Sequence, residues 1–158
     1  MHDILDDQFS SQYVRWISLV SIAGIALVFI TRFVRPFLAD AHPLIVFVFG
    51  ILPNFGAGLA LPFAGVMWVR GVWRIKRWSL SQLFAGIAVL SFAGLLIWEV
   101  VQLVAWAYPF DANDIVATAV GVLCTIVVHL LLVNARPPAP QAMRPQNSGE
   151  IHADRDQE

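Results

Sequence analysis

Four long apolar runs constrain this chain more than any other feature of its sequence. They cover residues 17–31, 44–69, 79–98 and 115–133 and contain hardly any charged side chains. Each run is near or above the roughly 18 apolar residues that indicate a transmembrane helix. Across the whole chain 58% of residues are apolar and 13% are charged, whereas a soluble domain has roughly 25% charged residues. The sequence therefore predicts an all-α integral membrane bundle of about four transmembrane helices.

The chain divides into three predicted parts. Residues 1–14 form an amino-terminal segment, residues 15–134 form the transmembrane domain, and residues 135–158 form a proline-rich, polar tail that is expected to be disordered. Regular spans are expected at residues 15–35, 79–106 and 114–134.

The second apolar run is too long for one straight span. From Pro43 to Arg70 it has 28 residues, which would make a helix of about 42 Å against a hydrocarbon core of about 30 Å. Because proline removes a backbone donor, we expect a break at Pro53-Asn54. The break would leave a short dipping, re-entrant helix at 44–52 and a true span at 55–73. Backbone groups freed in a membrane must be buried in protein or line a wet cavity, so Asn54 is predicted to face a pocket.

The basic residues predict the orientation. If the amino terminus is cytoplasmic, an even number of spans leaves only Arg32 and Arg35 outside and places eight basic residues inside, in agreement with the positive-inside rule. These eight are Arg15, Arg70, Arg74, Lys76, Arg77, Arg136, Arg144 and Arg155. Both termini are therefore predicted to be cytoplasmic.

Small residues recur every four positions on the second and fourth spans, a spacing that lets helix backbones approach closely. They are Gly56, Ala60 and Ala64, and Ala117, Gly121 and Thr125.

Polar residues gather at the outer ends of the last two spans, where Glu99 and Gln102 share a helix face and Asp111 and Asp114 begin the next helix. Such groups are costly at membrane depth and suggest function. Glu99 is predicted to act as a general acid or base, a proton relay or a hydrogen-bond donor. The plainer alternatives are that Glu99 and Gln102 only bond across helices and that Asp111 and Asp114 only cap a helix.

Arg32 and Arg35 lie three residues apart at the outer end of the first helix. They are expected either to extend toward lipid phosphates or to hold an anionic headgroup in the pocket. The single Cys124 and the lone outer pair of Asp40 and His42 make a poor metal site, so no metal or cofactor is expected. The net charge of −1 argues against a nucleic-acid partner.

The outer polar residues also resemble a known signature. Glu99-x-x-Gln102, Phe110-Asp111, Asp114 and Gly121 resemble the pattern of VanZ-like membrane proteins, with looser similarity at Pro53-Asn54 and at residues 61–65. Tyr108 stands where that family has Arg, and Thr118 stands where it has Asn. The resemblance implies a multi-helix bacterial inner-membrane protein of the cell envelope, linked through its named member to tolerance of the glycopeptide antibiotic teicoplanin, with no defined reaction. It also adds Tyr108 and Thr118 to the expected ligand-binding positions.

Two functions are consistent with these observations. In the first, an outward-facing polar pocket binds or acts on an envelope lipid or lipid-linked glycan. Glu99, Asp111 and Asp114 are then the candidate catalytic residues, and Asn54 and Gln102, with the arginines, position an anionic ligand. In the second, the chain is a non-enzymatic scaffold or accessory subunit that packs against other membrane proteins. The residues alone leave both functions open.

Overall fold

The computed structural model describes residues 11–73, 78–106 and 111–135, which are almost entirely helical and include no strand. The helices are α2 (Ser11–Val34), the short 3-10 helix η1 (Arg35–Leu38), α3 (Pro43–Gly71), α4 (Leu80–Trp106) and α5 (Ala112–Asn134). Four of them are long and apolar enough to cross a membrane. The prediction of an all-α bundle with four candidate spans is confirmed, and the chain is a multi-pass membrane protein.

The outer surface of the bundle is apolar. Large side chains such as Phe33, Val89, Leu90 and Val104 are more than two-thirds exposed, and many other aliphatic and aromatic residues accompany them. A protein in water rarely leaves apolar patches of more than a few hundred Å² uncovered. Lipid chains are the medium that suits this surface.

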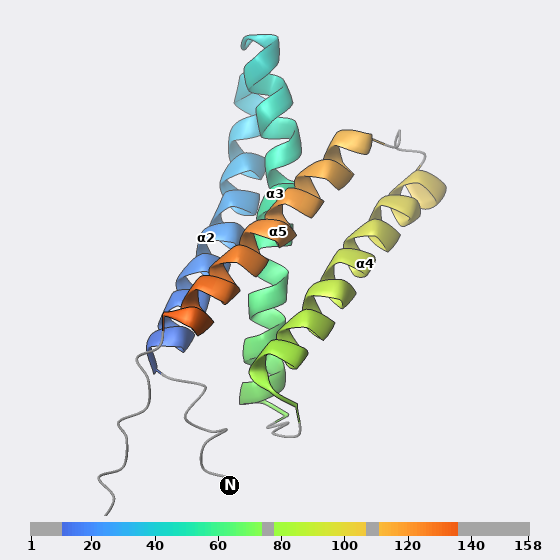
Figure 1. Ribbon diagram of the computed structural model, residues 1–158. Helices are drawn as coiled ribbons and strands as arrows, with labels where there is room; N and C mark the ends of the chain where they lie inside the picture. The colour runs from blue at the N-terminus through green and yellow to red at the C-terminus, as the bar shows by residue number, and fades with distance from the viewer. Residues whose placement is uncertain (1–10, 74–77, 107–110, 136–158) are drawn as a thin grey trace, which may run out of the picture.

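Helix α3 is the centre of the bundle. It packs extensively against α2 and α5 and less closely against α4, whereas α2 and α4 make no extensive contact with each other. Figure 1 shows that the beginning of α2 and the end of α5 lie at the same end of the bundle. The beginning of α3, the end of α4 and the beginning of α5 lie at the opposite end, which we call the pocket end.

Glycines allow the backbone of α3 to lie directly against the backbones of both α2 and α5. A Cβ atom on Gly24 of α2 would lie 2.6 Å from the carbonyl oxygen of Gly56, and one on Gly121 of α5 would clash with that of Phe55. A Cβ atom on Gly58 would likewise lie 2.5 Å from the carbonyl oxygen of Thr118. The close approach predicted at Gly56 and Gly121 is confirmed.

The structure differs from the sequence prediction at Pro53. One continuous helix of 29 residues runs from Pro43 to Gly71 and contains both Pro53 and Pro62, so a separate dipping helix at 44–52 is not formed. A proline removes one helical hydrogen bond, whereas ending the helix would free several backbone groups in an apolar medium. A helix that continues through Pro53 therefore loses fewer backbone hydrogen bonds than one that ends there.

The other proline of α3 has a visible compensation. Pro62 has no N–H to offer the carbonyl of Gly58, which lies four residues before it. The hydroxyl of Thr125 on α5 approaches the carbonyl oxygens of Gly58 at 3.3 Å and Leu59 at 3.2 Å, besides that of Gly121 in its own helix at 2.9 Å. The single O–H of Thr125 thus lies within hydrogen-bond distance of the carbonyl that the proline leaves without a donor, and it is shared with Leu59 and Gly121.

The core lies toward the end of the bundle that holds the beginning of α2. Buried Ile17, Phe63 and Phe84 belong to it. There the Tyr13 hydroxyl lies 2.8 Å from Nδ1 of His129, whose ring stacks on Phe84 at a centroid distance of 4.0 Å. His129 is buried in this core.

Candidate functional site

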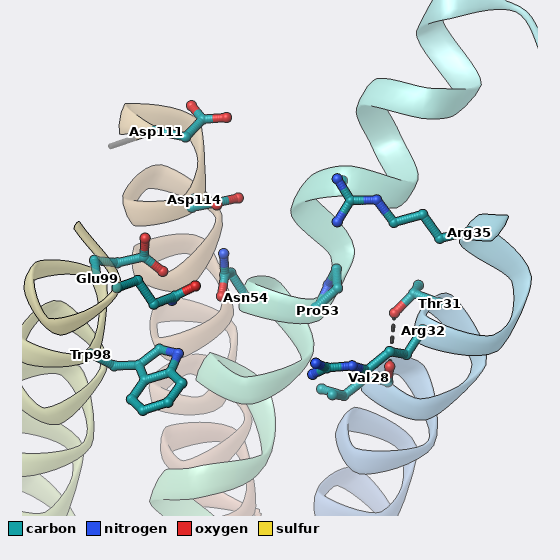
Figure 2. Close-up of a pocket in the computed structure, with 12 residues that line it drawn as sticks. Val28, Thr31, Arg32, Arg35, Pro53, Asn54, Trp98, Glu99, Asp111 and Asp114 are labelled. Atoms are coloured by element: carbon teal, nitrogen blue, oxygen red, sulfur yellow. Dashed lines mark hydrogen bonds between the residues drawn. The ribbon is translucent and has the colours of Figure 1, made fainter. Parts of the chain in front are cut away.

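A polar pocket of about 900 Å³ lies at the pocket end of the bundle, among all four long helices and η1. Figure 2 shows α4 on one side and α2 on the other, with α3 and α5 between them. The lining residues are Val28, Thr31, Arg32, Arg35, Gly50, Pro53, Asn54, Trp98, Glu99, Gln102, Asp111 and Asp114. The volume is within the range of roughly 300–1,000 Å³ that is usual for ligand sites.

One wall of the pocket comes from the end of α2 and from η1. Val28, Thr31, Arg32 and Arg35 recur at the spacing that places residues on one helix face. Thr31 is buried and its hydroxyl bonds to the carbonyl oxygens of Leu27 and Val28, at 2.8 and 2.9 Å, so it is satisfied within its own helix. In Figure 2 the guanidinium groups of Arg32 and Arg35 extend from this wall toward α3. This wall is therefore the cationic side of the pocket.

Helix α3 contributes Gly50, Pro53 and Asn54, again from one helix face. In Figure 2 the side-chain amide of Asn54 points toward Asp114, and it stabilises the ionised form of that carboxyl. Asn54 on α3 therefore faces the first turn of α5 across the pocket. Asn54 was predicted to face a pocket because it follows Pro53, and Asn54 does line one.

The opposite wall carries three carboxyl groups, Glu99 from α4 and Asp111 and Asp114 from α5. The Oδ1 atom of Asp111 accepts hydrogen bonds from the backbone N and the side-chain Nδ2 of Asn113, both at 2.8 Å. Asp111 is thus the N-cap of α5. Capping and pocket lining coincide in Asp111.

Electrostatic interactions divide the pocket into two sides. The Glu99 carboxyl is close enough to those of Asp114 and Asp111 to be repelled by them. Asp114 is in turn attracted by Arg35. Among the described residues no hydrogen bond or salt bridge fixes either Arg32 or Arg35. The pocket therefore presents two positive groups and a cluster of negative ones that do not neutralise each other by direct contact.

The pocket unites most of the site residues predicted from the sequence. Seven of the nine line it, namely Arg32, Arg35, Asn54, Glu99, Gln102, Asp111 and Asp114. Thr118 does not, because it is buried between α3 and α5 with its carbonyl against Gly58. Tyr108 lies outside the described residues. The catalytic and ligand-binding roles of the seven stay predictions.

Five further residues line the pocket that were not predicted from the sequence to do so, namely Val28, Thr31, Gly50, Pro53 and Trp98. Three of these carried a usable signal. Val28 and Thr31 lie seven and four residues before Arg35 and so share its helix face. Gly50 stands in the same relation to Asn54. A search along the helix face from each polar residue would have found them.

In the described part of the chain no group of three or more His, Cys, Asp or Glu side chains is placed to hold a metal ion. A second, apolar groove of about 380 Å³ lies between α3 and α5 on another face of α3, lined by residues such as Phe47, Leu52 and Val120. The two cavities differ sharply in polarity, and only the larger one gathers charged groups.

Comparison of the chain with protein-family models, with curated proteins and with solved structures finds no match.

Proposed function

We propose that this chain is a VanZ-like protein of the bacterial inner membrane whose pocket faces outward and binds an envelope lipid or lipid-linked glycan. One observation carries the proposal. Two arginines and three carboxyls from different helices line a single pocket at one end of an otherwise apolar bundle. Charged side chains at membrane depth are expensive and usually serve a ligand or a proton path. Caps and salt bridges alone would not need such a cavity.

The position of the pocket favours a ligand that comes from the membrane. The pocket lies between α2 and α4, which make no extensive contact with each other. A molecule whose headgroup occupies the pocket can therefore leave its chains in the bilayer, by way of the gap between these helices. Val28 and Trp98, from α2 and α4, give this side of the pocket an apolar border.

Within this proposal each polar residue has a role that its place allows. The arginines bind the anionic part of the ligand, while Asn54 and Gln102 donate hydrogen bonds that orient it. Glu99 can exchange a proton with the ligand, with Asp114 and Asp111 as its neighbours. The arginines of α2 and η1 replace the cation that the VanZ-like pattern places where this chain has Tyr108. A link to glycopeptide tolerance is part of the same proposal, with both termini in the cytoplasm.

Filling the pocket tests the proposal. A Cβ atom on Gly50 meets no atom within 4 Å, so Gly50→Trp adds bulk at the pocket without a backbone clash. Gly94 of α4 is equally open but does not line the pocket, which makes Gly94→Trp the matched control. After purification in mild detergent, we expect wild type and Gly94→Trp to retain lipid that Gly50→Trp has lost. Equal lipid content in all three proteins would refute a lipid-binding pocket.

A cellular test addresses the role of the carboxyls. In a strain with a measurable envelope phenotype that depends on this protein, Glu99→Gln combined with Asp114→Asn should abolish that phenotype while leaving the amount of protein in the membrane unchanged. An unaltered phenotype would show that these carboxyls are dispensable.

The alternative, a scaffold for other membrane proteins, is favoured by one observation. Helix α4 is the least buried of the four candidate spans and leaves residues such as Val89 and Leu90 uncovered. A scaffold should purify in mild detergent together with a stoichiometric partner. A clean monomer that retains lipid would support the pocket instead.

A further inference from the structure

We infer that the pocket recognises a zwitterionic phospholipid headgroup, with its phosphate at Arg32 and Arg35 and its primary ammonium group at the carboxyls of Glu99 and Asp114. This inference rests on the proposed function and narrows it to one class of envelope lipid. It follows from the placement of the positive and the negative groups on opposite walls of the pocket.

The two signs of charge occupy opposite walls. Arg32 and Arg35 come from α2 and η1, while Glu99, Asp111 and Asp114 come from α4 and α5. In Figure 2 the arginines and the carboxyls lie on either side of Asn54 and Pro53. A ligand that spans the pocket therefore meets cations at one end and anions at the other.

The cationic wall suits a phosphate. Guanidinium groups offer several N–H donors in a planar fork and bind phosphate oxygens with charge-assisted hydrogen bonds. Neither arginine is held by a hydrogen bond or salt bridge in the described residues. Both are therefore available to a ligand, and their spacing of three residues brings two forks to one side of the pocket.

The carboxyl wall suits a primary ammonium group. Glu99 and Asp114 repel one another, and Asp111 adds to this repulsion. An ammonium group carries three N–H donors and one positive charge, so it can bond more than one carboxylate and relieve their repulsion. A second phosphate or another anion at this wall would increase the repulsion.

This arrangement discriminates among headgroups. Phosphatidylethanolamine has a phosphate and a primary ammonium group joined by a short linker, and it complements both walls. Phosphatidylglycerol has the phosphate but only hydroxyls beyond it, so it leaves the negative charges of the carboxyls uncompensated. A diphosphate-linked lipid places more negative charge toward the same carboxyls. Of these three lipids, the zwitterionic one alone offers a group of opposite charge to each wall.

The test is a titration of the detergent-purified full chain with each lipid, followed by native mass spectrometry. Wild type should bind phosphatidylethanolamine about tenfold more tightly than phosphatidylglycerol, the size expected for one charge-assisted hydrogen bond. Arg32→Gln with Arg35→Gln should weaken both lipids about tenfold or more. Glu99→Gln with Asp114→Asn should weaken phosphatidylethanolamine alone and abolish the preference.

Matched controls use charges outside the pocket. Asp40→Asn removes an exposed carboxylate near the end of η1, and Arg15→Gln removes an exposed guanidinium near the start of α2. Both should bind as wild type does. Because Asn54 also interacts with Asp114, Glu99→Gln alone serves as a second variant if the double variant unfolds. It too should reduce the preference for phosphatidylethanolamine.

Three results would overturn the inference. They are equal or tighter binding of phosphatidylglycerol by wild type, a preference that survives loss of the carboxylates, and soluble phosphoethanolamine binding as tightly as the lipid. Gly50→Trp separates the two proposals. If wild type shows no headgroup preference but Gly50→Trp abolishes its lipid binding, the inference fails and the lipid pocket stands. If Gly50→Trp leaves lipid binding unchanged, both proposals are refuted.

Discussion

Gly24 of α2 and Gly56 of α3 face each other so closely that a Cβ atom on Gly24 would lie 2.6 Å from the Gly56 carbonyl oxygen. One turn farther toward the pocket end, Val28 on α2 and Pro53 on α3 line the pocket. The contact between the two glycines therefore fixes the spacing of the helices directly beneath the pocket. It links the packing of the bundle to the place where the ligand is proposed to bind.

A methyl group at this contact should destabilise the bundle. We expect Gly24→Ala to lower the free energy of unfolding by about 1–3 kcal/mol, because the backbone of α3 must move away. Gly94→Ala is the control, since a Cβ there meets nothing within 4 Å and alanine favours a helix. Denaturation in mixed micelles measures both variants. Equal stability of Gly24→Ala and wild type would contradict the close packing.

The hydroxyl of Thr125 should contribute to stability, because Pro62 has no N–H to donate to the carbonyl of Gly58. We expect Thr125→Val to lower the free energy of unfolding by about 0.5–2 kcal/mol. This range covers the loss of one hydrogen bond in a membrane and the cost of leaving a buried acceptor without a donor. In a Pro62→Ala background the new N–H can bond to Gly58 within α3. The double-mutant cycle should then show a smaller effect of Thr125→Val. An identical effect in both backgrounds would mean that Thr125 does not compensate for the proline.

Asp111 combines a cap with a pocket charge, and two substitutions separate these functions. Asparagine keeps an oxygen that accepts from the Asn113 backbone N–H, so Asp111→Asn should leave the stability close to that of wild type. Asp111→Ala loses the cap and should destabilise the protein by about 0.5–2 kcal/mol. Unfolding measurements compare the two. If Asp111→Asn is as unstable as Asp111→Ala, the negative charge rather than the cap stabilises α5.

The orientation of the bundle can be tested with single cysteines. In a Cys124→Ala background, Ala39→Cys marks the pocket end of the bundle and Asn134→Cys marks the opposite end. An impermeant maleimide added to intact spheroplasts should label position 39 and not position 134, because the pocket is proposed to face outward. Labelling of position 134 alone would reverse the orientation and place the pocket on the cytoplasmic side.

The sequence predicted the elements that depend on composition and helical spacing. Apolar runs located all four spans, since a long apolar helix satisfies its backbone hydrogen bonds within itself in lipid. Glu99, Gln102, Asp111 and Asp114 stood out because each is polar where its surroundings are not. They meet in one pocket because the adjoining ends of α4 and α5 bring them together.

Other features depend on tertiary contacts and could not be predicted from local sequence. Pro53 looked like a helix breaker, yet α3 continues through it. The pairing of Gly24 with Gly56 and the burial of Thr118 against Gly58 require knowing which helix packs on which. Spacing along one helix gives a face, but only the packed bundle shows what that face meets.

An experimental density map of the protein in a bilayer of native lipids tests the central claim most directly. The account predicts lipid density between the pocket ends of α2 and α4, with a phosphate within hydrogen-bond distance of Arg32 and Arg35. Its chains should run out into the bilayer past Val28 and Trp98. A pocket that contains only water, with both arginines turned to the bulk solvent, would contradict it.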